Sequence, residues 1–163
     1  SFPTRRSSDL ANYIAAKGVD GRTNYKGVLR ATDYQPKPAY FALQNLCTLF
    51  DGETALANDL IRPQKVEGAR SEDVQTVSFR RQGKPLAAVW LKTPLPSDSD
   101  RRAKVSLAAW FARGGKLERP VVVCLRSGKI QPCEVTGGGM VEISGLEAPD
   151  WPVVVTDASV VPV

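Results

Sequence analysis

The sequence predicts a mainly β protein, an antiparallel β-sandwich of about seven or eight strands preceded by one helix. Short apolar runs follow one another from residue 65 to residue 156, and turn-forming residues separate them about every 8–12 residues, a spacing typical of sandwiches. Residues 38–50 instead carry apolar side chains at helical spacings of three and four. With 163 residues, the chain is long enough for one domain with a hydrophobic core, or for one domain and part of another.

The predicted helix has a clear start and stop. Pro38 suits the first turn, where its fixed φ helps and its missing N–H would have no partner, and Gly52 supplies a left-handed residue just past the end. An isolated helix of about 13 residues is marginal in water, so it needs a surface to dock on. We expect its apolar stripe to form that contact. The stripe consists of Ala39, Ala42, Leu43, Leu46, Cys47, Leu49 and Phe50.

Residues 75–91 have the pattern of a β-hairpin. Val77 and Phe79 alternate onto one face, residues 82–84 form the turn, and residues 85–91 are apolar on both faces, which indicates a central strand. Residues 51–62 have no clear period, so we expect a connection there. By the same patterns, further strands are expected at residues 103–111, 120–125, 129–135, 140–144 and 151–156.

A second hairpin is predicted at residues 120–135, around a two-residue turn that would place Cys124 opposite Gln131. The three cysteines, Cys47, Cys124 and Cys133, match no metal-ligand spacing, and their odd number argues against a disulfide framework. We expect three buried free thiols.

The aromatic and acidic residues of the strands are interpreted as structural. Trp90, Trp110 and Trp151 have the chemistry to stack on sugar rings, but we expect them to pack in the core or against another domain. Trp90 lies in a run that is apolar on both faces, and Trp151 opens an apolar strand. Glu142, in an alternating strand, is expected to point to solvent.

The composition argues against several classes of function. The net charge of +5 is spread along the chain without the interleaved aromatic residues of a nucleic-acid platform, so no nucleic-acid partner is expected. No apolar run approaches the roughly 18 residues that span a bilayer, so no membrane partner is expected. The absence of histidine removes serine and cysteine triads and the commonest zinc ligand. No metal or other cofactor is expected.

Residues 1–10 (SFPTRRSSDL) resemble the translation of a common short-read sequencing adapter. We expect them to be a non-native leader and leave them out of the fold, with a native basic arm as the alternative. No signal peptide is visible, but on this interpretation its absence says nothing about export. The localisation therefore stays open, and the parent protein could be secreted or periplasmic.

Two parts of the chain resemble one class of enzyme. Residues 25–33 (YKGVLRATD) followed by residues 36–46 (PKPAYFALQNL) are similar to the final strand-to-helix segment of (β/α)8-barrel glycoside hydrolases. Residues 121–129 (VVVCLRSGK) and 150–157 (DWPVVVTD) resemble closing strands of the β-sandwich that packs beside the barrel in those enzymes. The resemblance implies a leader at residues 1–10, the last strand, loop and helix of a barrel at residues 11–52, and a C-terminal β-sandwich domain at residues 53–163.

The resemblance further implies a C-terminal fragment of a glycoside hydrolase that acts on a polysaccharide or oligosaccharide. Both catalytic carboxylates of such barrels are typically glutamates on earlier strands, and residues 1–52 contain no glutamate, so we expect no catalytic residue and no activity from the fragment itself. The sandwich would support the barrel, its missing N-terminal partner. If residues 13–16 are the last barrel strand, Asp20, Arg22 and Asn24 follow on the active-site face as candidate substrate-binding residues, with a solvated loop as the alternative.

Two other classes of protein remain open and make different structural predictions. A carbohydrate-binding β-sandwich module predicts two or more exposed, coplanar tryptophans. A structural or adhesive β-sandwich predicts that the helix packs its stripe wholly on its own sheet. The incomplete-barrel interpretation predicts that some of Tyr40, Leu43, Leu46 and Cys47 stay uncovered, as an exposed apolar patch.

Overall fold

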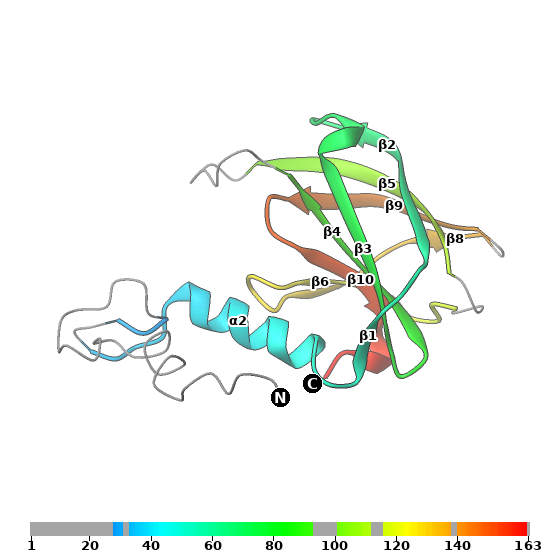
Figure 1. The fold of residues 1–163 in the computed structure, drawn as a ribbon. Coiled ribbons are helices and arrows are strands. Elements are labelled where there is room, and N and C mark those ends of the chain that lie inside the picture. The colour runs from blue at the N-terminus through cyan, green and yellow to red at the C-terminus, as the bar shows by residue number, and fades with distance from the viewer. Residues whose placement is uncertain (1–27, 31–32, 93–100, 112–115, 138–139, 163) are drawn as a thin grey trace, which may run out of the picture.

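The computed structural model describes residues 28–30, 33–92, 101–111, 116–137 and 140–162. In this part of the chain, ten strands form two antiparallel sheets, and one α-helix, α2 (Pro38–Leu49), precedes them. The sheets pack face to face, and α2 lies on the outer side of the larger sheet (Figure 1). The mainly β sandwich predicted from the sequence is confirmed.

The larger sheet has six strands in the order β1-β3-β4-β10-β6-β7, and the smaller has four in the order β2-β5-β9-β8. Two short 3-10 helices, Ser71–Asp73 and Ala158–Val160, complete the described elements. The strands of the larger sheet are β1 (Thr54–Leu56), β3 (Val74–Arg81), β4 (Lys84–Leu91), β10 (Val153–Asp157), β6 (Pro120–Cys124) and β7 (Ile130–Pro132). Those of the smaller sheet are β2 (Leu60–Glu67), β5 (Arg102–Trp110), β9 (Val141–Pro149) and β8 (Val135–Thr136).

The larger sheet is covered on both faces, and β4 shows this most clearly. Ala87, Val89 and Leu91 pack in the core between the two sheets, whereas Leu86 and Ala88 pack in a second core on the helix side. Successive side chains of a strand point to opposite faces, so a strand with two covered faces must be apolar throughout. The predicted central position of β4 is therefore confirmed.

The helix α2 docks on this outer face through its C-terminal half. Leu49 is only 2% exposed and packs with side chains of β6 and β10. Asn45 donates a hydrogen bond from Nδ2 to the carbonyl oxygen of Leu125 at 3.0 Å. The backbone of Gly128 lies so close that a Cβ there would stand 3.1 Å from the Asn45 side chain. The contact therefore joins one side of the helix to the loop between β6 and β7.

The hairpin of β3 and β4 forms as predicted. The two strands pair up to Arg81 and Lys84, and Gln82 and Gly83 make the two-residue turn between them. Both turn residues have positive φ, 50° and 78° respectively. This combination is the one that a type I′ turn requires, and it matches the right-handed twist of the strands.

The expectation of a connection at residues 51–62 is wrong, because β1 and the start of β2 lie there. Both are edge strands. Within β2, all of which is described, Ile61 alone is buried, and a register shift between Pro63 and Lys65 breaks the alternation. The described part has ten strands instead of the seven or eight expected, because β1 and β2 were not expected and the strand expected at residues 129–135 is divided into β7 and β8.

The predicted register of the second hairpin is also wrong. Val122, not Cys124, lies opposite Gln131, and the backbone N–H of Cys124 donates to the carbonyl oxygen of Lys129 at 2.9 Å. The loop is longer than two residues because Gly128, with a φ of 72°, turns the chain back and donates to the carbonyl oxygen of Cys124 at 2.8 Å.

Candidate functional site

The three candidate substrate-binding residues, Asp20, Arg22 and Asn24, lie outside the described residues. So do the leader at residues 1–10 and the candidate barrel strand at residues 13–16. Their roles therefore stay predictions, and the site has to be built from the surfaces that the described residues form.

The chain enters α2 through a small hairpin. The N–H of Lys37 donates to the carbonyl oxygen of Val28 at 2.8 Å, and the N–H of Arg30 donates to that of Gln35, also at 2.8 Å. Tyr34 lies in the turn, directly before Gln35, with a φ of 58° and an exposed side chain. Because Val28 is held beside the residue before the helix, the polypeptide upstream of residue 28 starts next to the N-terminal end of α2.

The helix leaves much of its apolar surface uncovered. Phe41, Leu43 and Leu46 are 48%, 45% and 41% exposed, and Cys47 is exposed as well. Within α2, all of which is described, Leu49 is the one buried residue. The sandwich therefore covers one side of the helix, and the exposed apolar patch expected for an incomplete barrel is present. Full burial of the stripe, expected for a self-sufficient structural sandwich, is not observed.

An apolar groove of about 430 Å³ runs along the uncovered side of α2. Phe50 and Phe79 meet edge to face in its wall, with ring centroids 4.8 Å apart. Among the residues that the structure describes, none that lines the groove is charged. The lining comes from the helix, from β3 and β4, and from residues next to β6 and β10: Leu46, Cys47, Phe50, Val77, Phe79, Ala88, Trp90, Leu125 and Pro152.

Features that usually stabilise a helix by itself are missing from α2. Its N-cap, Lys37, makes no side-chain capping hydrogen bond. The first turn carries no acidic residue and the last turn no basic residue, so no side chain there compensates the helix dipole. The helix therefore depends on what its sides contact.

The segment that follows α2 is fixed to the sheet by charge. Arg81, at the end of β3, is buried and forms an ion pair with Asp51 and a second with Glu53 at 3.6 Å. The hydrogen bond from Arg81 lowers the pKa of Asp51 below its ordinary value. The hydroxyl of Thr54 donates to the carbonyl oxygen of Leu49 at 2.8 Å. These contacts fix the C-terminal end of the helix relative to the β3–β4 hairpin.

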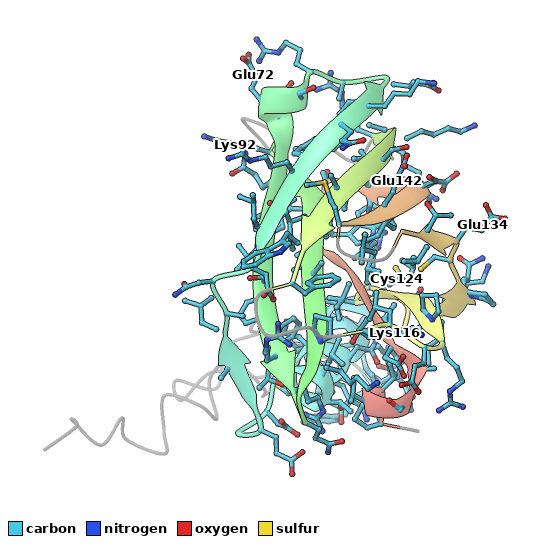
Figure 2. All side chains as sticks on the ribbon, turned by 90° about the vertical axis from the view of Figure 1, so that its right-hand side faces the viewer. Glu72, Lys92, Lys116, Cys124, Glu134 and Glu142 are labelled. Carbon is cyan, nitrogen blue, oxygen red and sulfur yellow. The ribbon has the colours of Figure 1, made fainter. Side chains whose placement is uncertain are left out.

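A second cleft, of about 760 Å³, opens between β7 and β9, where the edges of the two sheets separate. Trp151 lies in its wall, with the guanidinium carbon of Arg126 at 4.5 Å and that of Arg102 at 5.8 Å from the ring centroid. Arg102 also pairs with Glu147 at 3.0 Å. Both Cys124, labelled in Figure 2, and Cys133 line this cleft. Polar and apolar side chains both line the cleft, and the Trp151 ring is already in contact with the Arg126 guanidinium.

The expectation of three buried thiols is wrong. All three cysteines are free, but Cys47 is exposed in the apolar groove, and Cys124 and Cys133 are half-buried in the cleft. Burial raises the pKa of the Cys133 thiol. Burial also acts to raise the pKa of the Cys124 thiol, but several hydrogen bonds to the thiol, the strongest of them from Ser127, together outweigh burial and lower that pKa. The two thiols of the cleft therefore differ in reactivity.

The expectation that all three tryptophans are packed is wrong for Trp110. Trp110 is 50% exposed, at the end of β5 and on the outer side of the smaller sheet, across from the exposed Leu60 of β2. Trp90 and Trp151 are half-buried, the first in the apolar groove and the second under arginine side chains. Alternation along β5 is consistent with this position, because the strand neighbour Ala109 points inward and Trp110 therefore points outward.

The acidic residues of the sandwich have structural surroundings. Asp157 is 1% exposed, and its carboxylate accepts hydrogen bonds from the N–H groups of Glu118, Arg119 and Ser159 and from the Ser159 hydroxyl. Burial acts to raise the pKa of Asp157, but these four hydrogen bonds hold it well below its ordinary value. Glu142 is exposed, as expected, and points outward (Figure 2). Asp157 is thus a cap for two loop segments.

Within the described ranges, no cluster of three or more His, Cys, Asp or Glu side chains has the arrangement to hold a metal ion. In the same part of the chain, no helix has the length and apolar character needed to cross a membrane.

No protein-family model matches the chain, and no curated protein sequence matches it. Among solved structures, it is similar to part of a cycloisomaltooligosaccharide glucanotransferase from Paenibacillus sp., crystallised with cycloisomaltoheptaose. The TM-score is 0.53 at 12% sequence identity, over 85% of this chain and 24% of the other. The two proteins share a fold over this region. The chain spans about a quarter of the length of the protein it resembles.

Proposed function

We propose that this chain is the C-terminal part of a (β/α)8-barrel glycoside hydrolase or related glycosyl-transferring enzyme, and that its sandwich supports the catalytic barrel. Residues 11–52 would contribute the last barrel strand, loop and helix, and residues 53–163 the supporting domain. The substrate would be a polysaccharide or oligosaccharide, and the catalytic glutamates would lie upstream.

The observation that carries this proposal is the exposed stripe of α2. A helix with apolar residues uncovered, without a side-chain cap at its N-terminus, and next to an apolar groove is what an element of a larger domain would look like. The shared fold with part of a glucanotransferase supports a carbohydrate-active parent. In that protein the matching region is likewise a minor part of a long chain.

The proposed role of the sandwich is mechanical. The contacts of Asn45 and Leu49 with the sheet, and of Arg81 with the segment after α2, hold the helix in one orientation. A barrel that included α2 as its last helix would be held by the same contacts. Loss of these contacts would loosen the end of the barrel without removing any catalytic group.

The test is to compare this chain with a chain extended upstream in its natural reading frame. Both are assayed for hydrolysis of aryl glycosides and for hydrolysis and transfer with α- and β-linked glucans. We expect turnover from the extended chain, lost when either of two barrel-strand glutamates is changed to glutamine, and none from the 163-residue chain. Turnover by the short chain that disappears on substitution of one of its own carboxylates would overturn the proposal.

Carbohydrate binding by the sandwich is a second candidate, and the exposure of Trp110 favours it. It meets only part of what such a module predicts, because Trp110 is exposed whereas Trp90 and Trp151 are half-buried. Its indole lies beside Leu60 on an outer sheet face, where a pyranose ring has room to stack. The test is affinity electrophoresis in gels that contain dextran, soluble cellulose derivatives or xylan. Retardation should be lost in Trp110→Ala and kept in Phe41→Ala, a control with an equally exposed aromatic residue. Equal mobility of all variants with and without polysaccharide excludes this candidate.

A further inference from the structure

We propose that the cleft between β7 and β9 is a binding site for a neutral oligosaccharide. The inference rests on the proposed function for the class of ligand, because a carbohydrate-active enzyme meets such chains, and it goes beyond that function by giving the sandwich a ligand of its own. The site is separate from the outer sheet face at Trp110, since the tryptophan in the cleft is Trp151.

The walls of the cleft come from both sheets and exist before any ligand binds. Strands β6, β7 and β10 of the larger sheet contribute one wall, and β5 and β9 of the smaller sheet contribute the other. Each wall is held by backbone pairing within its sheet. The volume of about 760 Å³ lies within the range of about 300–1,000 Å³ that is usual for small-ligand sites. The cleft is therefore large enough for a short chain of sugar rings.

Strand β9 has an irregular backbone where it borders the cleft. Its pairing with β5 shifts register between Val105 and Leu107, so that Ser144 and Gly145 of β9 together face one residue of β5. Both of them line the cleft. The φ of Gly145 is 67°, and a Cβ there would meet no atom within 4 Å, so the space in front of this backbone is open. Bulges of this kind redirect side chains and often lie next to functional sites.

One wall of the cleft carries an aromatic ring that is held in place. The guanidinium carbon of Arg126 lies 4.5 Å from the centroid of the Trp151 ring, and that of Arg102 lies 5.8 Å from it. Arg102 is itself paired with Glu147 at 3.0 Å. A ring that is already fixed loses little conformational freedom when a ligand binds. It offers an apolar surface to the C–H groups of a pyranose.

Hydrogen-bonding groups of both kinds line the cleft. Gln131 and Ser144 can each donate and accept, Lys129 can donate, and Glu134 can accept. All four residues are exposed. A sugar hydroxyl likewise donates and accepts, so this mixed set can replace the hydrogen bonds to water that the hydroxyls lose on binding.

The balance of charge favours a neutral ligand. Among the residues that line the cleft, the positive charges of Arg102 and Lys129 are matched by the negative charges of Glu134 and Glu147. An anion or a cation would therefore be attracted by one pair and repelled by the other. An apolar ligand would remove water from these polar groups without replacing their hydrogen bonds.

An extended peptide that adds a strand to the larger sheet is the main alternative, because β7 is an edge strand beside the cleft. However, β7 has only three residues, and Pro132 at its end has no backbone N–H to donate. A short edge that contains proline is a poor template for a further strand. The geometry therefore favours a ligand that is held by side chains.

The tryptophans allow the site to be tested in the 163-residue chain, because Trp90, Trp110 and Trp151 lie on three different surfaces. The chain is labelled with ¹⁵N, and its assigned indole and backbone N–H signals are followed by NMR during titration. The probes are maltohexaose, isomaltohexaose, cellohexaose and xylohexaose, each up to about 10 mM. An oligogalacturonate of the same length serves as the charged comparison.

We expect at least one of the neutral sugars to shift the signals of Trp151, Ser144 and Gly145, with a Kd of about 1 mM or lower. Gln131→Ala and Glu134→Gln should each weaken this binding by about three- to ten-fold, because each variant loses a hydrogen bond to the sugar.

The matched control is Glu72→Gln, which should bind as tightly as the unchanged chain. Glu72 is paired with Arg70 and lies outside the cleft, well away from Glu134 (Figure 2). Both Glu72 and Glu134 are exposed, so the two substitutions remove the same charge from the surface of the protein.

Three results would overturn the inference. The first is the absence of any shift at Trp151 with every neutral sugar. The second is a shift confined to Trp110, which would place the sugar on the outer sheet face. The third is tighter binding of the oligogalacturonate than of every neutral sugar, which would identify a site for an anion.

None of these three results bears on the turnover of the chain extended upstream, so the proposed function would stand. An extended chain without turnover, together with a cleft that binds sugars, would contradict the proposed function alone.

Discussion

Replacing Leu43 and Leu49 by alanine, one at a time, separates the uncovered side of α2 from its docked side. Both residues are leucines in the same helix, so each substitution removes the same atoms. Leu49 is 2% exposed in the core beneath the helix, whereas Leu43 is 45% exposed. The two variants therefore differ mainly in the surroundings that the side chain loses.

The expected loss of unfolding free energy in each variant follows from this difference in burial. Leu49→Ala removes a buried side chain and leaves a cavity, a change that typically costs about 2–5 kcal/mol. Leu43 has about half of its side chain in water, so Leu43→Ala should cost about 1 kcal/mol or less, and the higher helix propensity of alanine offsets a few tenths of that. The losses of unfolding free energy in the two variants should therefore differ by at least about 1 kcal/mol.

The assay is hydrogen exchange of the α2 backbone amides, together with urea unfolding followed by tryptophan fluorescence. Exchange is needed because the helix can undock while the sandwich stays folded, and a global transition would then miss the effect. Leu49→Ala should speed exchange in α2 by about 30-fold or more, and Leu43→Ala by less than about five-fold. Equal effects of the two substitutions would show that the uncovered side of the helix is in fact packed, and would refute the reasoning.

The remaining predictions concern a buried carboxylate, the two thiols of the cleft, and a turn. The pKa of Asp157 lies well below its ordinary value, so its stabilisation is present above about pH 4 and is lost as the pH falls further. Asp157→Asn should cost about 3 kcal/mol at pH 7 and flatten the decline of Tm below about pH 4; an unchanged decline contradicts this assignment. With iodoacetamide at neutral pH, Cys124 should react faster than Cys133, as peptide mass spectrometry would show; the reverse order contradicts the pKa directions. Gln82→Asn should raise stability by a few tenths of a kcal/mol and Gly83→Ala should lower it by about 1 kcal/mol, because both positions have positive φ; urea unfolding measures both, and a stabilising Gly83→Ala excludes the turn type.

The elements that could be predicted are those with a strong local signal. Pro38 marks the start of α2 and Gly52 lies three residues past its end, although Gly52 does not take the left-handed conformation expected for it. The residues of the β3–β4 hairpin combine alternation with a turn in which Gly83 takes a positive φ. These signals arise from steric and hydrogen-bonding preferences of neighbouring residues, so they can be recognised without knowing which part of the chain packs against the element.

The strands that were missed lack such a signal. Leu60–Glu67 is an edge strand that buries Ile61 alone, so its side chains show no two-residue period. The order of strands in the larger sheet, in which β10 pairs with both β4 and β6, joins residues that are far apart in the sequence. No local pattern encodes that pairing.

The candidate site, like the fold, could be predicted from the sequence only in part. The apolar stripe of α2 is visible in the sequence, but which of its residues stay uncovered depends on where the helix lies on the sheet. The groove combines α2 with Trp90 of β4 and Pro152 before β10, and the cleft combines Cys124 with Cys133. Sequence patterns identified several of these residues singly, as core tryptophans or buried thiols, and gave no indication that they share a surface.

By itself the amino-acid sequence determined the class of the fold, the position of α2 and the turn between β3 and β4, because backbone preferences and the alternation of apolar residues act over a few neighbouring positions. The tertiary structure alone decided that α2 buries Leu49 and exposes Leu43 and Leu46, and that an uncharged groove lies beside them. The physical reason is that burial of a side chain is a property of the surfaces packed around it, and those surfaces come from parts of the chain that only folding brings together.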